Sequence, residues 1–165
     1  MLERAHASLR AVGVEATLIQ APMQEFTVPS LVKLAIIPLD TFGHLLEQSD
    51  QLLALTAAQA TLEIGGILAI DVSNGNNRGE IREELVHHLT AESGDGETLI
   101  TKWVNRCPDP ANQVDELIYW YDATGPDGTV QRTTVQFSLR YYTRFELTLL
   151  LERAGFEIEA LYGSY

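Results

Sequence analysis

Two uninterrupted apolar runs mark the first half of the chain. Residues 34–37 and 67–72 are apolar at nearly every position, whereas a strand with one wet face would alternate. Such runs are typical of strands covered on both faces in a parallel sheet. The apolar positions between them, over residues 49–62, recur with the period of a helix that ends at a Gly-Gly pair. This order predicts a right-handed βαβ unit in which the two runs are adjacent parallel strands.

The two ends of the chain carry similar patterns. Residues 2–12 have a helical stripe closed by Gly13, and residues 15–20 read as a short strand. Near the other end, Thr143 and Glu146 form a capping box at the start of a helix. Gly155 ends that helix, and residues 156–162 alternate like a strand. Because the chain opens inside a helix without an N-cap and stops just after a strand, we expect elements of the domain to be missing at both ends.

The middle of the chain has a different period. Residues 73–77 form a Gly/Asn loop, and residues 79–90 carry a helical pattern. Three segments rich in aromatic and β-branched residues follow, at 98–106, 114–122 and 130–139, separated by Pro/Gly/Asp turn signals. The alternation at the third segment predicts an antiparallel meander with one wet face. The aromatic residues of these segments would form a packing face or a dimer interface: Trp103, Tyr119, Trp120 and Tyr121.

Composition narrows the class of partner. The formal net charge is −12, from 23 acidic and 11 basic residues, without a basic cluster. Binding to nucleic acid or to an anionic membrane surface needs local positive charge, so both are disfavoured. The single cysteine, Cys107, excludes a disulfide within the chain and fits a cytoplasmic protein. The adjacent His87 and His88 would not face one ligand on a helix, so we expect no metal site.

The residues after the first apolar run are the best candidates for chemistry. Asp40-Thr41-Phe42-Gly43-His44 lies past the carboxyl end of a predicted parallel strand, where ligands bind in open α/β sheets. Asp40 could polarise a substrate and His44 could act as a general base. In the alternative reading, Asp40 caps a turn and His44 packs at a helix start. A hydrolase built on the same pair lacks a nucleophile elbow.

The order of these elements resembles the class I S-adenosylmethionine-dependent methyltransferases of the small-molecule type. Residues 34–45 resemble the family's fourth strand and the loop after it, and residues 62–71 resemble its Gly-Gly turn into the fifth strand. Residues 141–156 resemble its last helix and sixth strand. The resemblance implies an α/β fold: a partial Rossmann-like sheet with an inserted three-stranded antiparallel β-meander. It divides a single domain, residues 1–165, into a partial core (1–72), the insertion (73–140) and the last helix and strand (141–165).

The resemblance also implies a site and a cofactor. S-adenosylmethionine would lie against Ala21, Pro22, Met23, Pro38, Leu39, Asp40 and Thr41. The methyl acceptor, a small molecule, would contact Phe42, His44, Arg140, Tyr141 and Tyr142, with His44 and Asp40 as catalytic residues. The family's Gly-rich loop after the first strand and the acidic residue after the second are absent from these 165 residues. We therefore expect weak or no cofactor binding by this chain.

Two functions follow from this interpretation. The first is methyl transfer to N or O of a small molecule, with this chain as a truncated form. The second is a non-catalytic, self-associating protein that retains the methyltransferase framework. Either way we expect a homo-oligomer, because the strand at residues 34–37 would have an open apolar edge.

Overall fold

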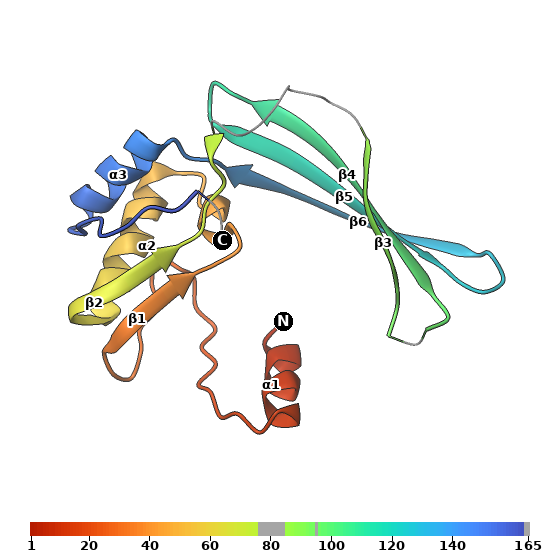
Figure 1. Ribbon diagram of the computed structural model, residues 1–165, viewed down its shortest axis with the longest axis horizontal. Coiled ribbons are helices and arrows are strands. Elements are labelled where there is room, and N and C mark those ends of the chain that lie inside the picture. Colours follow the sequence, from red (N-terminus) through yellow and green to blue (C-terminus); the bar gives the residue numbers. More distant parts are fainter. Residues whose placement is uncertain (76–84, 95, 164–165) are drawn as a thin grey trace.

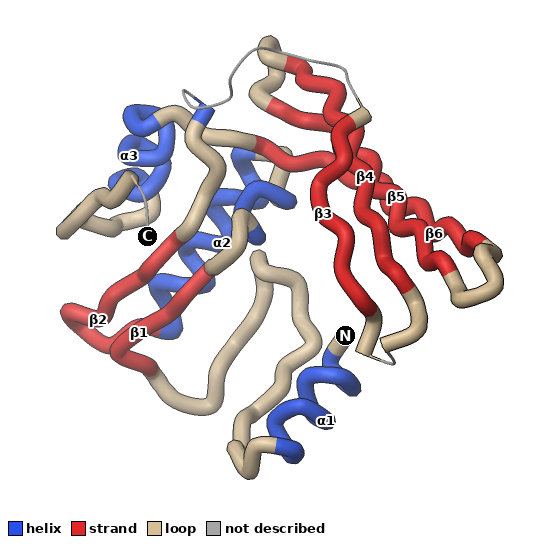
Figure 2. The backbone as a smooth tube through the Cα atoms, turned by 45° about the vertical axis from the view of Figure 1, so that its right-hand side comes forward, coloured by secondary structure: helices blue, strands red, loops and turns tan. Residues whose placement is uncertain are grey.

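The computed structural model of the chain describes residues 1–75, 85–94 and 96–163. Two parts stand side by side (Figure 1): a parallel strand pair layered with two helices, and a curved antiparallel sheet. The N-terminal helix α1 (Leu2–Ala11) has no buried residue, stands clear of the other elements (Figure 2), and ends before Gly13 at φ +69°. None of the described helices is long and apolar enough to cross a membrane.

The βαβ prediction is confirmed. Strands β1 (Val32–Ile37) and β2 (Leu62–Ile70) pair in parallel, with Leu34 opposite Ile67 and Ile37 opposite Ile70. Helix α2 (Gln48–Thr61) is the crossover that parallel pairing requires. The Gly-Gly pair does not end this helix as predicted, because it lies inside β2. There Gly65, at φ +77°, accommodates the register irregularity near the start of the ladder.

The two strands are covered on only one face, contrary to the prediction. Ile37, Leu68 and Ile70 pack toward α2 and α3 (Arg144–Arg153). On the opposite face Leu34, Ile36 and Ile67 remain 52%, 61% and 51% exposed. The unbroken apolar runs show that both faces of the strand pair are apolar, but other described residues cover only one of these faces.

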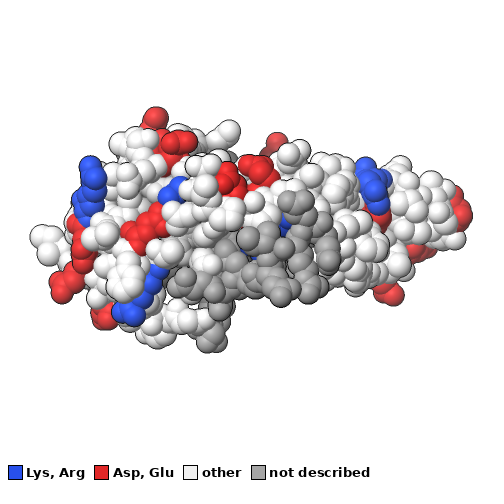
Figure 3. Space-filling view, turned by 90° about the horizontal axis from the view of Figure 1, so that it is seen from above, with Lys and Arg blue, Asp and Glu red and all other residues white. Residues whose placement is uncertain are grey.

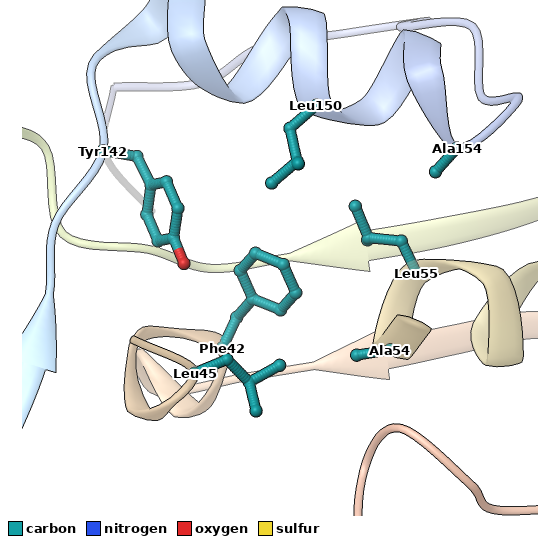
Figure 4. Packing of buried hydrophobic residues seen from close by; sticks show 7 residues of the cluster. All are labelled: Phe42, Leu45, Ala54, Leu55, Tyr142, Leu150 and Ala154. Atoms are coloured by element: carbon teal, nitrogen blue, oxygen red, sulfur yellow. The ribbon is translucent and has the colours of Figure 1, made fainter. Parts of the chain in front are cut away.

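The core lies between α2, α3 and the loop after β1. Its buried members meet in Figure 4: Phe42, Leu45, Ala54, Leu55, Tyr142, Leu150 and Ala154. The apolar face of α3 points into this core, since Leu147 and Leu151 pack beside Leu150 and Ala154. Gln51 is the buried polar group at this point, and its Nε2 donates to the Leu45 carbonyl at 2.7 Å. That bond ties α2 to the loop that enters it.

The second part is a four-stranded antiparallel sheet of order β3-β4-β5-β6. Its strands are β3 (Val86–Glu92), β4 (Leu99–Asp109), β5 (Val114–Thr124) and β6 (Val130–Arg140). The three predicted strands are confirmed, and β3 is a fourth. The helix predicted at 79–90 is wrong over 86–90, which pair with β4; residues 79–84 of that prediction lie outside the described residues. Pairing with a neighbour has overridden the local helical period.

Two further strand predictions are wrong. Residues 15–20 and 156–162 have no regular secondary structure. A strand needs a partner for its backbone hydrogen bonds, and within the described chain these segments pair with neither sheet. The apolar and polar pattern of these segments was therefore not sufficient to predict a strand.

The sheet's aromatic residues divide between its two faces. Trp103 pairs across the strands with Trp120, whereas Tyr119 and Tyr121 point to the other face because side chains alternate along β5. A single aromatic packing face, as predicted, is therefore wrong. Burial along β6 depends on position: residues 130–136 are exposed and residues 137–140, which approach the first part, are half-buried.

Candidate functional site

A cavity of about 300 Å³ lies where the two parts meet, past the carboxyl ends of β1 and β2. The loop after β1 forms one wall and the facing side of β5 and β6 forms the other. The lining residues are Leu39, Asp40, Ser73, Asp115, Leu117, Tyr119, Leu139, Arg140 and Tyr141. This is the position at which open α/β sheets bind ligands.

The first wall is built on an unusual backbone. Leu39 and Asp40 both have positive φ, +55° and +57°, a region that L-residues other than Asn and Asp rarely adopt. Thr41–His44 then form the 3₁₀ helix η1. Ser73 donates to the Asp40 carboxylate through its backbone N (3.0 Å) and its hydroxyl (2.5 Å). Asp40 is therefore fixed at the cavity wall by the segment that follows β2.

The end of β6 closes tightly over η1. A Cβ atom at Gly43 would lie 2.8 Å from the Arg140 carbonyl oxygen and 3.0 Å from Asp40 Oδ1. No side chain fits between these backbones without displacing one of them. Glycine at this position therefore lets the two walls of the cavity approach each other.

Arg140 joins the sheet to α3. Its Nη2 is 2.7 Å from Glu146 Oε1, and its Nη1 donates to the Asn112 carbonyl. Gln113 Nε2 donates to the other oxygen of Glu146 at 2.6 Å. Burial acts to raise the pKa of Glu146, but the hydrogen bonds from Arg140 and Gln113 outweigh it and hold the pKa below its usual value. Arg140 also lines a second cavity, of about 420 Å³, beside the β4–β5 turn.

An aromatic group forms the wall on the sheet side. The Tyr119 ring meets Phe137 edge-on at 4.9 Å, and the Lys102 ammonium sits 3.8 Å from the Tyr119 centroid. Burial, then the neighbouring Tyr121 and Asp40, raises the pKa of Tyr119. Its hydroxyl is therefore protonated at neutral pH and able to donate a hydrogen bond. Burial lowers the pKa of Lys102.

The structure brings some of the predicted site residues together and separates others. Asp40, Leu39, Arg140 and Tyr141 all line the cavity. His44 does not line it: its exposed ring lies 5.6 Å from that of Phe137, which in turn meets the lining residue Tyr119 at 4.9 Å. Two predicted acceptor contacts, Phe42 and Tyr142, lie in the core: they are 0% and 2% exposed, with rings 5.5 Å apart. Burial strongly raises the pKa of the Tyr142 hydroxyl.

The predicted cofactor edge fits only part of S-adenosylmethionine. Ala21, Pro22 and Leu39 are exposed and could face an apolar ring, while Met23 packs against the core. Two polar groups of this edge are engaged within the protein. Leu39 N donates to Asp71 Oδ2 at 3.0 Å, and the Thr41 hydroxyl donates to the Pro38 carbonyl at 2.6 Å. The edge thus suits the adenine ring better than the polar ribose and amino-acid parts.

Sequence reasoning missed five of the nine residues that line the cavity. Ser73 and the sheet residues Asp115, Leu117, Tyr119 and Leu139 were not predicted as site residues. A signal for three of them was available, since Asp115, Leu117 and Tyr119 alternate along β5 and so share one face. That pattern does not show which face of β5 meets the parallel strands. Among the described residues, no group of three or more His, Cys, Asp or Glu side chains is placed to hold a metal ion.

Comparison with known proteins identifies the fold. No protein-family model matches the sequence, and neither does any curated protein. Solved structures do match. An S-adenosylmethionine-dependent methyltransferase from Clostridium acetobutylicum superposes with a TM-score of 0.75 at 12% identity, over 93% of this chain. The chain has the fold of these methyltransferases.

Two further methyltransferases share this fold. They are the sugar N-methyltransferase KedS8 from a Streptoalloteichus species (TM-score 0.71, 17% identity, 90% of this chain) and the amino pentose methyltransferase CalS10 from Micromonospora echinaspora (0.66, 16%, 82%). This chain spans 58%, 57% and 54% of the lengths of the three enzymes. The likeness thus establishes a methyltransferase fold over part of the neighbours' length.

Proposed function

We propose that this chain provides the acceptor side of an S-adenosylmethionine-dependent methyltransferase, which transfers a methyl group to a nitrogen or oxygen of a small molecule. The observation that carries the proposal is the 300 Å³ cavity at the carboxyl ends of β1 and β2, with Asp40 in its wall. The methyltransferase fold of the solved neighbours supports the reaction type.

The charged residues that line the cavity favour an amine acceptor. Asp115 is paired with Arg106 at 2.9 Å, and Arg140 with Glu146 at 2.7 Å. Asp40, in contrast, accepts its hydrogen bonds from the neutral groups of Ser73. These bonds do not neutralise the negative charge of Asp40. That charge faces the cavity and would attract an ammonium group. KedS8 and CalS10, by their descriptions, also act on amino sugars or sugar nitrogens.

In this proposal the chain's residues orient the acceptor and manage its proton. S-adenosylmethionine, when bound, supplies an electrophilic methyl group on a sulfonium. Its methyl group would pass to the acceptor nitrogen's lone pair, while the sulfur kept the electron pair of the broken C–S bond. Before that, His44 would take a proton from the bound ammonium, which frees the lone pair, while Asp40 holds the nitrogen and Arg140 and Tyr141 contact the rest of the acceptor. The methylated nitrogen then keeps its remaining protons as a secondary ammonium.

A matched pair of sugars tests the acceptor site. D-glucosamine and D-glucose differ at one position, an amine against a hydroxyl. We expect glucosamine to shift the amide signals of Asp40, Tyr119 and Tyr141 in NMR titrations, and to bind more tightly than glucose. Asp40→Asn should weaken glucosamine binding about tenfold, the value of one charge-assisted hydrogen bond. Glu63→Gln, at the exposed start of β2, is the control and should leave binding unchanged.

Product formation tests the reaction itself. At millimolar S-adenosylmethionine, mass spectrometry should detect methylated glucosamine, and Asp40→Asn should reduce it. Equal binding of the two sugars, or signals that shift only away from the cavity, would contradict the amine assignment.

A second candidate function, self-association without catalysis, rests on the uncovered face of the parallel strands. Leu34, Ile36 and Ile67 are each more than half exposed there. A dimer that covered this face should bury roughly 1,000 Å² or more in total. Light scattering should then report twice the 18.3 kDa mass of the chain, and Ile36→Lys should return it to one chain. A single-chain mass at micromolar concentration would argue against this function.

A further inference from the structure

The backbone of the Leu39–Asp40 pair is held in a conformation that its sequence does not favour. Two successive residues with φ near +55° cost roughly 1–3 kcal/mol each, and leucine, which lacks the short polar side chain of Asn or Asp, has no local compensation. Such a conformation persists only where the surrounding structure imposes it. Leu39 is also 83% exposed, so packing of its own side chain does not impose it.

The segment after β2 supplies the restraint. Asp71 brackets the end of β1: its backbone N donates to the Ile37 carbonyl at 3.0 Å, and its Oδ2 accepts from Leu39 N at 3.0 Å. Ser73 binds both carboxylate oxygens of Asp40, and its own carbonyl accepts from Tyr142 N at 3.2 Å. Four hydrogen bonds thus fasten the loop after β1 to the loop after β2, which is in turn fastened to the start of α3.

We propose that Asp71 and Ser73 are positioning residues that impose the left-handed Leu39–Asp40 turn and so aim the Asp40 carboxylate at the acceptor. This inference rests on the proposed function for the identity of the acceptor. Ser73 occupies one side of the carboxylate and Asp40 still lines the cavity, so the restrained carboxylate has a single orientation. A carboxylate that rotated freely would lose rotamer entropy on binding an amine; the restrained one has lost it on folding.

Hydrogen exchange tests the restraint without any ligand. We expect the Leu39 amide to exchange slowly despite the exposure of its residue, because Asp71 Oδ2 accepts its hydrogen. Asp71→Ala should make this amide exchange as fast as an unprotected loop amide, whereas Asp71→Asn, which keeps an acceptor oxygen, should restore part of the protection. In the Asp71→Ala background, Leu39→Gly should recover thermal stability, because glycine adopts positive φ without strain.

Sugar binding tests the consequence for the acceptor. Ser73→Ala should weaken D-glucosamine binding about three- to tenfold with little effect on D-glucose, and Ser73→Thr should restore it because the hydroxyl returns. The matched control is Ser138→Ala. Ser138 makes the same kind of hydrogen bond, to Glu116 at 2.7 Å, but its target lies outside the cavity lining. A purely structural role for Ser73 would move the unfolding midpoint and leave the ratio of the two affinities unchanged.

The two readouts separate this inference from the proposed function. A wild-type chain that binds neither sugar refutes the amine acceptor. In that case the hydrogen-exchange rate of the Leu39 amide still tests whether the restraint exists. Fast exchange of that amide in the wild type overturns the restraint. Slow exchange together with an unchanged affinity ratio in Ser73→Ala overturns the role in acceptor binding.

Discussion

The two parts of the molecule are stabilised by different means. The layer of β1, β2, α2 and α3, together with the segments next to them, holds the buried apolar cluster, which runs from Phe42 and Leu45 after β1 to Tyr142 and Ala154 on either side of α3. In the four-stranded sheet, β3 and most of β6 are exposed and β4 and β5 are mainly half-buried, so the sheet relies on its ladders and on polar pairs within the described chain. Asp122, for example, accepts two bonds from Arg132, at 2.6 and 2.7 Å, and one from Trp103 Nε1 at 3.1 Å. One part therefore depends on apolar burial, and the other on directional bonds.

The candidate site lies at the boundary between these two parts. Asp40 and Ser73 belong to the packed layer, whereas Asp115, Leu117 and Tyr119 belong to the sheet. Changes in the layer should therefore cost stability and binding together, and changes on the sheet should alter binding with less cost in stability. The charges follow no such division: on the face drawn in Figure 3, the coloured basic residues lie apart from one another among acidic ones.

Truncation of a core aromatic residue should have the largest effect. Phe42 is fully buried between Tyr142 and the helices. Phe42→Ala should lower the free energy of unfolding by about 3–5 kcal/mol, from lost burial and the cavity left behind. The matched sheet variant, Val135→Ala, removes a side chain that is 42% exposed, and should cost less than about 1 kcal/mol. Urea denaturation measures both, and equal losses would contradict the division between the two parts.

The ion pair between Arg140 of the sheet and Glu146 of α3 should contribute less to the free energy of unfolding than Phe42 does. Its contribution should also depend on pH. Because the pKa of Glu146 is lowered in the folded chain, its ionised form stabilises the fold above the unfolded pKa of about 4.3. That contribution disappears as pH falls through the lower folded value. Glu146→Gln should therefore destabilise the chain by about 1–3 kcal/mol at pH 7, and the difference from wild type should shrink between about pH 5 and pH 3.

A control on the same helix makes this result specific. Glu152→Gln changes an exposed carboxylate of α3 and should leave stability within about 0.5 kcal/mol at either pH. A gap between Glu146→Gln and wild type that stayed constant down to pH 3 would show that charge at Glu146 is not what joins the sheet to α3.

The same comparison explains which elements were predictable from the sequence. In the packed layer, α2 and α3 were predicted from the helical period of their apolar residues, and β1 and β2 from unbroken apolar runs, although one face of those runs is exposed. The capping box was predicted too, but only half of it forms as expected: Thr143 Oγ1 accepts from Glu146 N, at 3.4 Å, while the Glu146 carboxylate bonds to Arg140 and Gln113. A long-range partner has replaced a local one.

In the sheet, predictions succeeded for strands with strong turn signals and failed elsewhere. β3 carries apolar residues at helical spacing, and its strand character comes from pairing with β4, which no local pattern encodes. The cavity shows the same limit. Asp40 and Arg140 were identified from their place after predicted elements, whereas Ser73, Asp115 and Tyr119 belong to the site because two distant segments meet, a fact of tertiary structure.

The smallest effect we expect is the binding of the cofactor product S-adenosylhomocysteine to this chain. The edge at residues 21–23 and 38–41 belongs to the packed layer alone, and two of its polar groups already bond within the chain: Leu39 N to Asp71 and the Thr41 hydroxyl to the Pro38 carbonyl. The ribose hydroxyls and amino-acid group of S-adenosylhomocysteine would give up water without gaining partners from these groups, which costs binding free energy. Apolar contact with the adenine ring remains, and is too little by itself for tight binding. Calorimetric titration of residues 1–165 should therefore show an affinity weaker than micromolar, and any NMR shifts should be confined to this edge. A micromolar dissociation constant would show that the packed layer supplies polar partners that its hydrogen bonds do not reveal, and shifts on β5 would place the cofactor in contact with the sheet as well.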